Sequence, residues 1–111
     1  MPSVARRWVW LAGLAMIGSA SSSLALAEPA SNPAALERLV RQDCGSCHGM
    51  TLKGGLGPDL RASRLAGRSP ETLSQIILDG VPGTAMPPWR PLISEADALW
   101  IANYLLAETG E

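Results

Sequence analysis

Apolar residues recur at the three- and four-residue spacing of an amphipathic helix in three separate segments of the chain. The first predicted helix has Asn32 as its N-cap and Pro33 at its first helical position. Its apolar face is expected to consist of Leu36, Leu39 and Val40. This helix should run into the region of Cys44.

The second predicted helix has clear signals at both ends. Ser69 is suited to cap it, Pro70 to open it, and Glu71 to lie beside the positive end of the helix dipole. Its apolar stripe comprises Leu73, Ile76 and Ile77. Gly80 should end the helix.

The third predicted helix begins at Ser94, where Asp97 three positions later forms a pair similar to a capping box. Its apolar residues are Leu99, Trp100, Ile101, Tyr104 and Leu105. This helix is expected to close the domain.

The segments between these helices, residues 53–58 and 81–88, contain too much Gly and Pro to be regular structure. No segment shows the alternation of a β-strand. Long irregular loops in so small a domain need a reason, and wrapping the two faces of a cofactor would provide one. We therefore predict an all-α single domain with three or more helices around one cofactor.

The N-terminus has the pattern of a secretory signal peptide. Arg6 and Arg7 precede an apolar run from Trp8 to Ile17, and small residues follow. We expect residues 1–27 to be removed, leaving residues 28–111 as the mature domain. A retained membrane anchor is the alternative, but serines and Gly18 interrupt the run too early to span a bilayer. The two arginines also permit twin-arginine export, but we expect ordinary export of the unfolded chain.

The charge and composition of residues 28–111 narrow the possible functions. This part has seven basic and ten acidic residues, so its net charge is −3, and nucleic acid is an unexpected partner. We also expect no membrane association after cleavage. The segment contains no Phe, and its aromatic residues are Trp89, Trp100 and Tyr104. A large flat apolar cofactor would supply the interior that these residues cannot.

The strongest chemical motif is the C-x-x-C-H sequence from Cys44 to His48. Two thiols at this spacing can add to the vinyl groups along one edge of a haem, and the adjacent imidazole reaches the iron from the same turn. We therefore predict one covalent haem c, with Cys44 and Cys47 as attachment residues and His48 as proximal iron ligand.

Other uses of the motif fit less well. A zinc site commonly needs four Cys or His ligands, and Cys44, Cys47 and His48 are the only such residues in the chain. A thioredoxin-like redox pair is expected near a strand-helix-strand pattern, which is absent. A plain disulfide is possible in an oxidising compartment, but it would close too short a loop to stabilise the fold much.

The second axial ligand should be a methionine. Met50 is two residues from His48 and cannot reach the opposite face of the haem, whereas Met86 is distant in sequence. Pro87 and the following proline restrict the backbone beside Met86 and fix the direction of its sulfur. A methionine that only fills the core is the alternative.

Two filled axial positions leave the iron no site for a substrate, so we predict an electron-transfer protein and not an enzyme. Thioether ligation raises the reduction potential. The competing class, a haem enzyme or gas sensor in which Met86 is displaced, would need a polar distal group, and no second His exists to supply one.

With these residues in place, the sequence from Glu28 onward resembles a class I cytochrome c: C-x-x-C-H after a first helix, then Gly57-Pro58, then Met86 in a proline-bearing loop before a terminal helix. The resemblance implies that the Pro58 carbonyl accepts a hydrogen bond from His48. It also implies that the first and last helices cross, which would place Leu36, Leu39 and Val40 near Leu99, Tyr104 and Leu105.

More narrowly, residues 44–58 and 79–89 resemble the small periplasmic cytochrome c that accompanies the haem d-containing dissimilatory nitrite reductase of denitrifying bacteria. This resemblance implies that nitrite reductase as the redox partner. We separately expect a monomer, and the export signal places it in the periplasm. It leaves open whether the protein is an electron donor in denitrification or a redox component in maturation of the haem d cofactor.

Two residues beside the methionine loop have open roles. Trp89 is suited either to donate its indole N–H to a haem propionate or to cover the haem edge. Arg90 is suited either to balance a propionate charge or to be a solvated loop residue.

Overall fold

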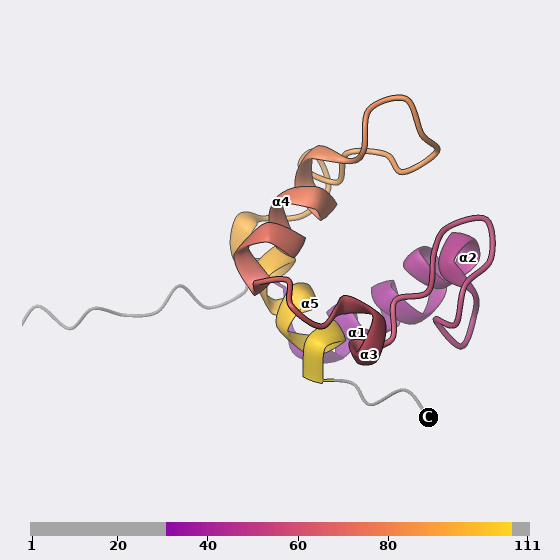
Figure 1. Ribbon diagram of the computed structural model, residues 1–111. Helices are drawn as coiled ribbons and strands as arrows, with labels where there is room; N and C mark the ends of the chain where they lie inside the picture. Colours follow the sequence, from indigo (N-terminus) through magenta and orange to yellow (C-terminus); the bar gives the residue numbers. More distant parts are fainter. Residues whose placement is uncertain (1–30, 108–111) are drawn as a thin grey trace, which may run out of the picture.

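The computed structural model describes residues 31–107, and the predicted signal peptide lies outside the described residues. Every regular element within this range is helical: α1 (Pro33–Leu39), η1 (Val40–Cys44), α2 (Gly45–His48), α3 (Ala62–Leu65), α4 (Pro70–Asp79) and α5 (Glu95–Ala107). The elements form an open ring, with α5 at its base and two long loops at its tips (Figure 1). The all-α prediction is therefore confirmed.

The structure contains the predicted N-cap hydrogen bonds of the first two predicted helices, α1 and α4. Asn32 Oδ1 accepts a hydrogen bond from the Ala35 N–H at 2.9 Å. Ser69 Oγ accepts one from the Thr72 N–H at 3.1 Å. Each side chain thereby satisfies a backbone donor that has no partner inside its helix. Helix α4 ends before Gly80, whose φ of 66° lies in the left-handed region that favours glycine.

Asp97, in the first turn of α5, links this helix to the segment before α1. The Ser94 N–H donates to Asp97 Oδ2 at 3.1 Å, and the Asp97 N–H donates to Ser94 Oγ at 3.0 Å, which is the predicted capping box. Asp97 Oδ1 also accepts from the Ser31 N–H at 2.9 Å. Because the side chain is only 2% exposed, this carboxylate fixes the segment before α1 against α5.

The core-facing side of α5 differs in part from the sequence prediction. Its buried residues are Asp97, Ala98, Ile101, Ala102 and Leu105. The apolar members follow the i, i+3, i+4, i+7 spacing of one helix face, and Leu99 falls outside that stripe. Leu99 is 36% exposed, so its predicted place in the packing between α1 and α5 is wrong. Leu36 and Val40 do lie in the core with Leu105.

Two elements were not predicted from the sequence. The first helix passes through the π-helical turn η1 before it reaches Cys44, and α3 is a single helical turn after the Gly-rich loop. Neither has a distinctive pattern of apolar residues. Both contribute residues to the central cavity, Asp43 and Cys44 from η1 and Arg64 and Leu65 from α3, so they help to form the site.

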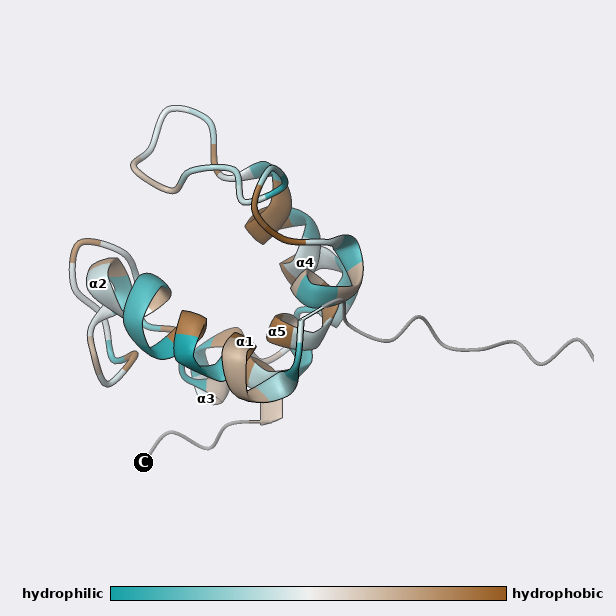
Figure 2. Cartoon of the chain, turned by 180° about the vertical axis from the view of Figure 1, so that it is seen from behind, coloured by the Kyte–Doolittle hydropathy of each residue, from teal (hydrophilic) through white to brown (hydrophobic). Residues whose placement is uncertain are grey.

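The buried core is thin and lies along the ring. Its largest fully buried side chains are Leu36, Leu78, Ile101 and Val40. Apolar segments of α4 and α5 face the hollow (Figure 2). None of the helices between residues 31 and 107 combines the length and apolar character needed to cross a membrane.

The Asp97 contacts predict a pH-dependent contribution to stability. Burial raises the pKa of Asp97, but the hydrogen bonds from Ser31 and Ser94 outweigh it and lower the pKa below its ordinary value. Asp97→Asn is expected to reduce the free energy of unfolding by about 1–3 kcal/mol at neutral pH, measured by urea denaturation. Because the folded-state pKa is depressed, this loss should be full above about pH 5 and shrink as pH falls below about 4.

Glu71→Gln, at the exposed first turn of α4, is the matched control and should change stability little. An Asp97→Asn protein as stable as wild type at neutral pH would contradict the assigned role.

Candidate functional site

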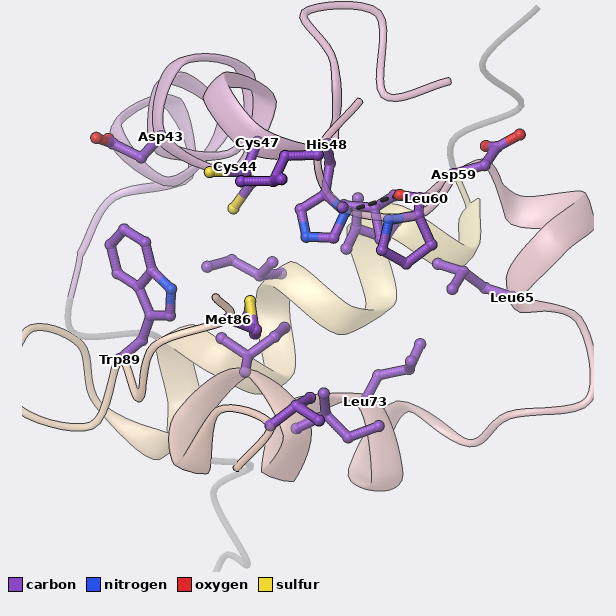
Figure 3. A pocket seen from close by; sticks show the side chains of 18 of the residues that line it. Asp43, Cys44, Cys47, His48, Asp59, Leu60, Leu65, Leu73, Met86 and Trp89 are labelled. Atoms are coloured by element: carbon purple, nitrogen blue, oxygen red, sulfur yellow. Dashed lines mark hydrogen bonds between the residues drawn. The ribbon is translucent and has the colours of Figure 1, made fainter. Parts of the chain in front are cut away.

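The hollow of the ring is a cavity of about 1170 Å³. It slightly exceeds the roughly 300–1,000 Å³ of ordinary small-molecule pockets. Cys44 reaches it from the end of η1, Cys47 and His48 reach it from α2, and Met86 reaches it from the loop after α4 (Figure 3). The apolar side chains that line it include Leu39, Leu65, Leu73, Ile76, Ile77, Ile101 and Leu105. Every sequence-predicted site residue, namely Cys44, Cys47, His48, Pro58 and Met86, lines this one cavity.

The ring of His48 is held by one short hydrogen bond. Its Nδ1 lies 2.7 Å from the carbonyl oxygen of Pro58. Since a carbonyl can only accept, Nδ1 must donate, and the proton is therefore fixed on that nitrogen. In the neutral ring this tautomer leaves the lone pair on Nε2, which is the form in which an imidazole binds a metal ion. This contact agrees with the one implied by the resemblance to class I cytochromes c.

The loop between α2 and α3 carries Pro58 to that position through backbone hydrogen bonds. The Gly54 N–H donates to the His48 carbonyl, and the Gly57 N–H donates to the Cys47 carbonyl, both at 2.8 Å. At the base of the loop the Leu60 N–H donates to the Leu52 carbonyl at 2.9 Å. The loop is thus tied back to the motif whose histidine it orients.

Gly57 and Leu52 have structural roles that the sequence reasoning missed. A Cβ at position 57 would lie 2.6 Å from His48 Cε1 and 2.7 Å from Nδ1, so only glycine lets the loop approach the imidazole. Leu52 is buried although its φ is 59°, a backbone conformation that costs energy for a residue other than glycine. The Gly-Pro dipeptide is the only sequence signal for the first, and the second has none.

Both cysteines are free thiols, so the structure does not contain the structural disulfide considered above. Burial raises the pKa of the Cys44 thiol to about 11, and the neighbouring Asp43 carboxylate adds to the rise. The Cys44 thiol is therefore neutral near pH 7, unlike the activated thiolate of a redox dithiol. Within residues 31–107 no three His, Cys, Asp or Glu side chains cluster as metal ligands.

Met86 is held by the polar contacts of its own loop. Thr84 Oγ1 donates to the Val81 carbonyl at 2.7 Å and accepts from the Met86 N–H at 3.3 Å. The Val81 N–H in turn donates to the Met86 carbonyl at 3.2 Å. The side chain of Met86 points into the cavity from the side opposite His48 (Figure 3). Met50 is 65% exposed and does not line the cavity.

The two residues with open roles have different surroundings. Trp89 lines the cavity, at the end where Asp43 and Cys44 lie (Figure 3). Arg90 does not line it, and its guanidinium contacts Asp79 at 2.7 Å and Glu95 at 3.1 Å. The positive charge of Arg90 is therefore neutralised by two carboxylates of its own chain.

These residues suit a covalently held haem. A cavity with apolar walls would bury the macrocycle, the two thiols are the attachment groups, and an imidazole with a free Nε2 and a thioether are its usual axial ligands. The lining also carries charged groups, namely the carboxylates Asp43 and Asp59 and the cations Lys53, Arg61, Arg64 and Arg68.

Comparison with known protein families identifies the fold and its cofactor. Residues 31–105 match the family described as cytochrome c oxidase, cbb3-type, subunit III. That match includes Cys44, Cys47, His48, Pro58 and Met86. The cysteines and the following histidine fit the haem attachment site of c-type cytochromes.

Individual relatives agree with that family. The chain is 66% identical to cytochrome c55X of Paracoccus denitrificans over 71 residues, which cover 64% of this chain and 69% of the relative. It is 43% identical to cytochrome c55X of Stutzerimonas stutzeri over 106 residues, 94% of each chain. These relatives are cytochromes and not enzymes, as predicted for this chain.

Two solved structures are similar to the described fold. The c-type cytochrome NirC is 49% identical, with a TM-score of 0.64, and the match covers 66% of this chain and 86% of that one. The dihydro-heme d1 dehydrogenase NirN in complex with DHE is 36% identical, with a TM-score of 0.59. The second match covers 63% of this chain but only 15% of that larger one.

The close approach of Gly57 to His48 predicts the effect of one added methyl group. Gly57→Ala should displace the imidazole and break its hydrogen bond to Pro58, with a loss of about 1–3 kcal/mol in the free energy of unfolding. Denaturant titration measures the loss, and changed proton NMR shifts of the His48 ring would report the displacement.

Gly45→Ala is the control, because a Cβ at position 45 makes only 3.5 Å contacts and the residue is already helical. If Gly57→Ala leaves the His48 resonances unchanged, the steric argument is wrong.

Proposed function

The chain belongs to the cytochrome c family, and on that premise we propose that it transfers single electrons through one haem c, as a donor in nitrite respiration. The observation that carries the proposal is the meeting of Cys44, Cys47, His48 and Met86 in a single apolar cavity (Figure 3). The haem supplies a one-electron couple between ferrous and ferric iron.

In this proposal the motif residues fix the position of the cofactor. Cys44 and Cys47 hold it through thioether bonds at one end of the cavity. His48 binds the iron through Nε2, and Pro58 keeps the imidazole in a single tautomer and orientation. A ligand that does not rotate between oxidation states lowers the reorganisation that accompanies each electron transfer.

Met86, across the cavity from His48, would provide the second iron ligand (Figure 3). Thr84 and Val81 hold its backbone, so the sulfur does not depend on the iron alone for its position. Leu73, Ile77 and the other apolar wall residues exclude water, which disfavours the additional positive charge of the ferric state. With His48 and Met86 both bound to it, the iron would have no position open to a substrate, which fits electron transfer and not catalysis at the metal.

We further propose that the protein works in the periplasm as a monomer, after removal of residues 1–27. The arginines and apolar run at the N-terminus support export, and residues 28–111 would then be the mature domain. Haem can be attached only to thiols that are reduced and accessible. Both cysteines are free thiols, and Cys47 is exposed.

The partner proposed for this electron carrier is the haem d-containing nitrite reductase. A second role, redox chemistry in maturation of the haem d cofactor, is favoured by one specific finding. The chain is 36% identical over 69 residues to a dihydro-heme d1 dehydrogenase of Pseudomonas aeruginosa, of which it spans 14%. A related cytochrome domain is therefore part of an enzyme whose name refers to that cofactor.

Substitution of the methionine tests the electron-transfer proposal. In the haem-loaded protein, Met86→Ala should abolish the weak long-wavelength absorption band of sulfur bound to ferric haem. It should also lower the reduction potential and let carbon monoxide bind the ferrous protein. Absorption spectroscopy and redox titration measure these changes.

The matched control is Met50→Ala, which removes an exposed thioether and should leave the band in place. Mass spectrometry of the exported protein should show the added mass of one haem. Ready binding of carbon monoxide by the wild-type protein at neutral pH would argue against filled axial positions.

Deletion of the gene separates the two roles. As a donor, the cytochrome should leave behind a nitrite reductase that contains haem d but receives electrons slowly. As a maturation component, its loss should give nitrite reductase that lacks haem d. The haem content of the purified enzyme, measured by its absorption spectrum, decides between these outcomes.

A further inference from the structure

Residues 81–88 form the loop that carries Met86, at one tip of the ring, and little packing holds this loop in place (Figure 1). Every residue from position 81 to position 85 is exposed, as are Pro87 and Pro88. A Cβ at Gly83 would have no heavy atom within 4 Å. Hydrogen bonds inside the loop shape it, but only contacts at its base can fix the methionine relative to the helices.

The segment that follows the loop is bonded to the C-terminal end of α4. The Trp89 N–H donates to the Ile77 carbonyl, and the Arg90 N–H donates to the Leu78 carbonyl, both at 3.1 Å. These carbonyls are among the last four of the helix, which have no partner inside it. The backbone after the methionine therefore completes α4 and is fixed to it.

Gly80, on the other side of the loop base, lets the two sides come this close. A Cβ at position 80 would lie 2.7 Å from the carbonyl oxygen of Met86, 2.7 Å from the carbonyl carbon of Pro87 and 2.8 Å from the nitrogen of Pro88. All three are backbone atoms, which cannot turn aside as the end of a flexible side chain can. The glycine that ends α4 thus leaves room for the methionine segment.

The side chain of Arg90 adds a cross-link at the same place. Its Nη2 lies 2.7 Å from Asp79 Oδ1, and its Nη1 lies 3.1 Å from Glu95 Oε1. Asp79 is the last residue of α4, and Glu95 is the first residue of α5. One guanidinium therefore joins the end of α4 to the start of α5, four residues after Met86.

Asp79 is placed where a carboxylate does not favour its own helix. A negative charge at a helix C-terminus opposes the helix dipole, and α4 has no basic residue in its last turn to offset that charge. The favourable contacts of Asp79 are instead with Nε and Nη2 of Arg90, in the segment beside the methionine. The pair therefore serves the junction between the helix and the loop and not the helix itself.

We propose that Arg90 is a positioning residue for Met86, which keeps the base of the loop closed against α4 and α5 so that the sulfur stays at the iron. The inference rests on the haem ligation proposed above. An exposed ion pair contributes little to overall stability, because water and salt screen it. What this pair changes is the fraction of molecules in which the loop is open, and thus how readily another ligand replaces the sulfur.

Other residues at the loop base are less suited to test this role. Trp89 lines the cavity, so its substitution would change the surroundings of the haem directly. A side chain at Gly80 would collide with the backbone of the loop. Arg90 does not line the cavity, so an effect of its substitution on the iron ligand must act through the loop.

The test measures binding of free imidazole to the haem-loaded full chain in its ferric form. Imidazole replaces the sulfur only where the loop is open, and its binding removes the absorption band of the sulfur-iron bond. Arg90→Gln and Asp79→Asn should each raise the apparent affinity for imidazole by roughly three- to tenfold. The double variant should bind no more tightly than Arg90→Gln alone, because both changes remove one contact. Arg90→Lys keeps the charge but not the planar fork, so it should reverse part of the increase.

Salt provides a second readout, since it screens exposed ion pairs. An increase in sodium chloride from about 0.01 M to about 1 M should raise the imidazole affinity of the wild-type protein and leave that of Arg90→Gln nearly unchanged. The control Arg38→Gln removes an exposed charge of α1 that does not line the cavity, and it should behave as the wild type in both measurements.

The inference is overturned if Arg90→Gln binds imidazole no more tightly than Arg38→Gln does. It is also overturned if the effects of Arg90→Gln and Asp79→Asn simply add. A loss of global stability in urea by the same factor as the gain in imidazole affinity would overturn it as well, because the effect would then not be local to the loop. In each of these cases a wild-type protein with its haem and its sulfur band leaves the proposed function intact. A wild-type protein without that band would contradict the ligation by Met86 itself, and the inference with it.

Discussion

The apolar cavity at the centre of the ring is the constraint on which the remainder of the structure depends. Helix α4 directs the partly exposed Ile76 and Ile77 toward space that no side chain of residues 31–107 fills. Exposed to water, such surface opposes folding by roughly 25 cal/mol for each Å². A covalently held macrocycle converts that surface into a core, which is why the chain folds with so few aromatic residues. Binding of the cofactor should therefore also stabilise the fold of this protein.

The residues proposed to bind the iron are positioned by backbone contacts more than by side-chain packing. The loop that orients His48 is bonded to the carbonyls of Cys47 and His48 itself, and the loop that carries Met86 is closed by Val81 and Thr84. Each loop can therefore keep its shape with an exposed outer surface. This arrangement suits an electron carrier, because residues that would hold the cofactor keep their positions on loops that are themselves open to solvent.

The sequence was sufficient to predict the parts of the fold that depend on local signals. Asn32, Ser69 and Ser94 cap helices as their residue types predict, and the C-x-x-C-H motif and Met86 lie at one cavity. The sequence was insufficient where the environment of a residue depends on how distant segments pack together. The exposure of Leu99, the steric role of Gly57 and the positive φ of Leu52 follow from how segments meet, and no periodic pattern encodes that.

The family match indicates that the functional unit is small. It spans residues 31–105, a range that includes both thiols, both proposed axial ligands and Arg90. A similar domain makes up about 15% of the dihydro-heme d1 dehydrogenase structure. Because a similar fold is also part of that larger chain, the cavity and the loops that position His48 and Met86 need no support from outside this range. The proposed chemistry of the site therefore depends on contacts within about 75 residues, and a larger chain that contains such a domain adds its other functions elsewhere.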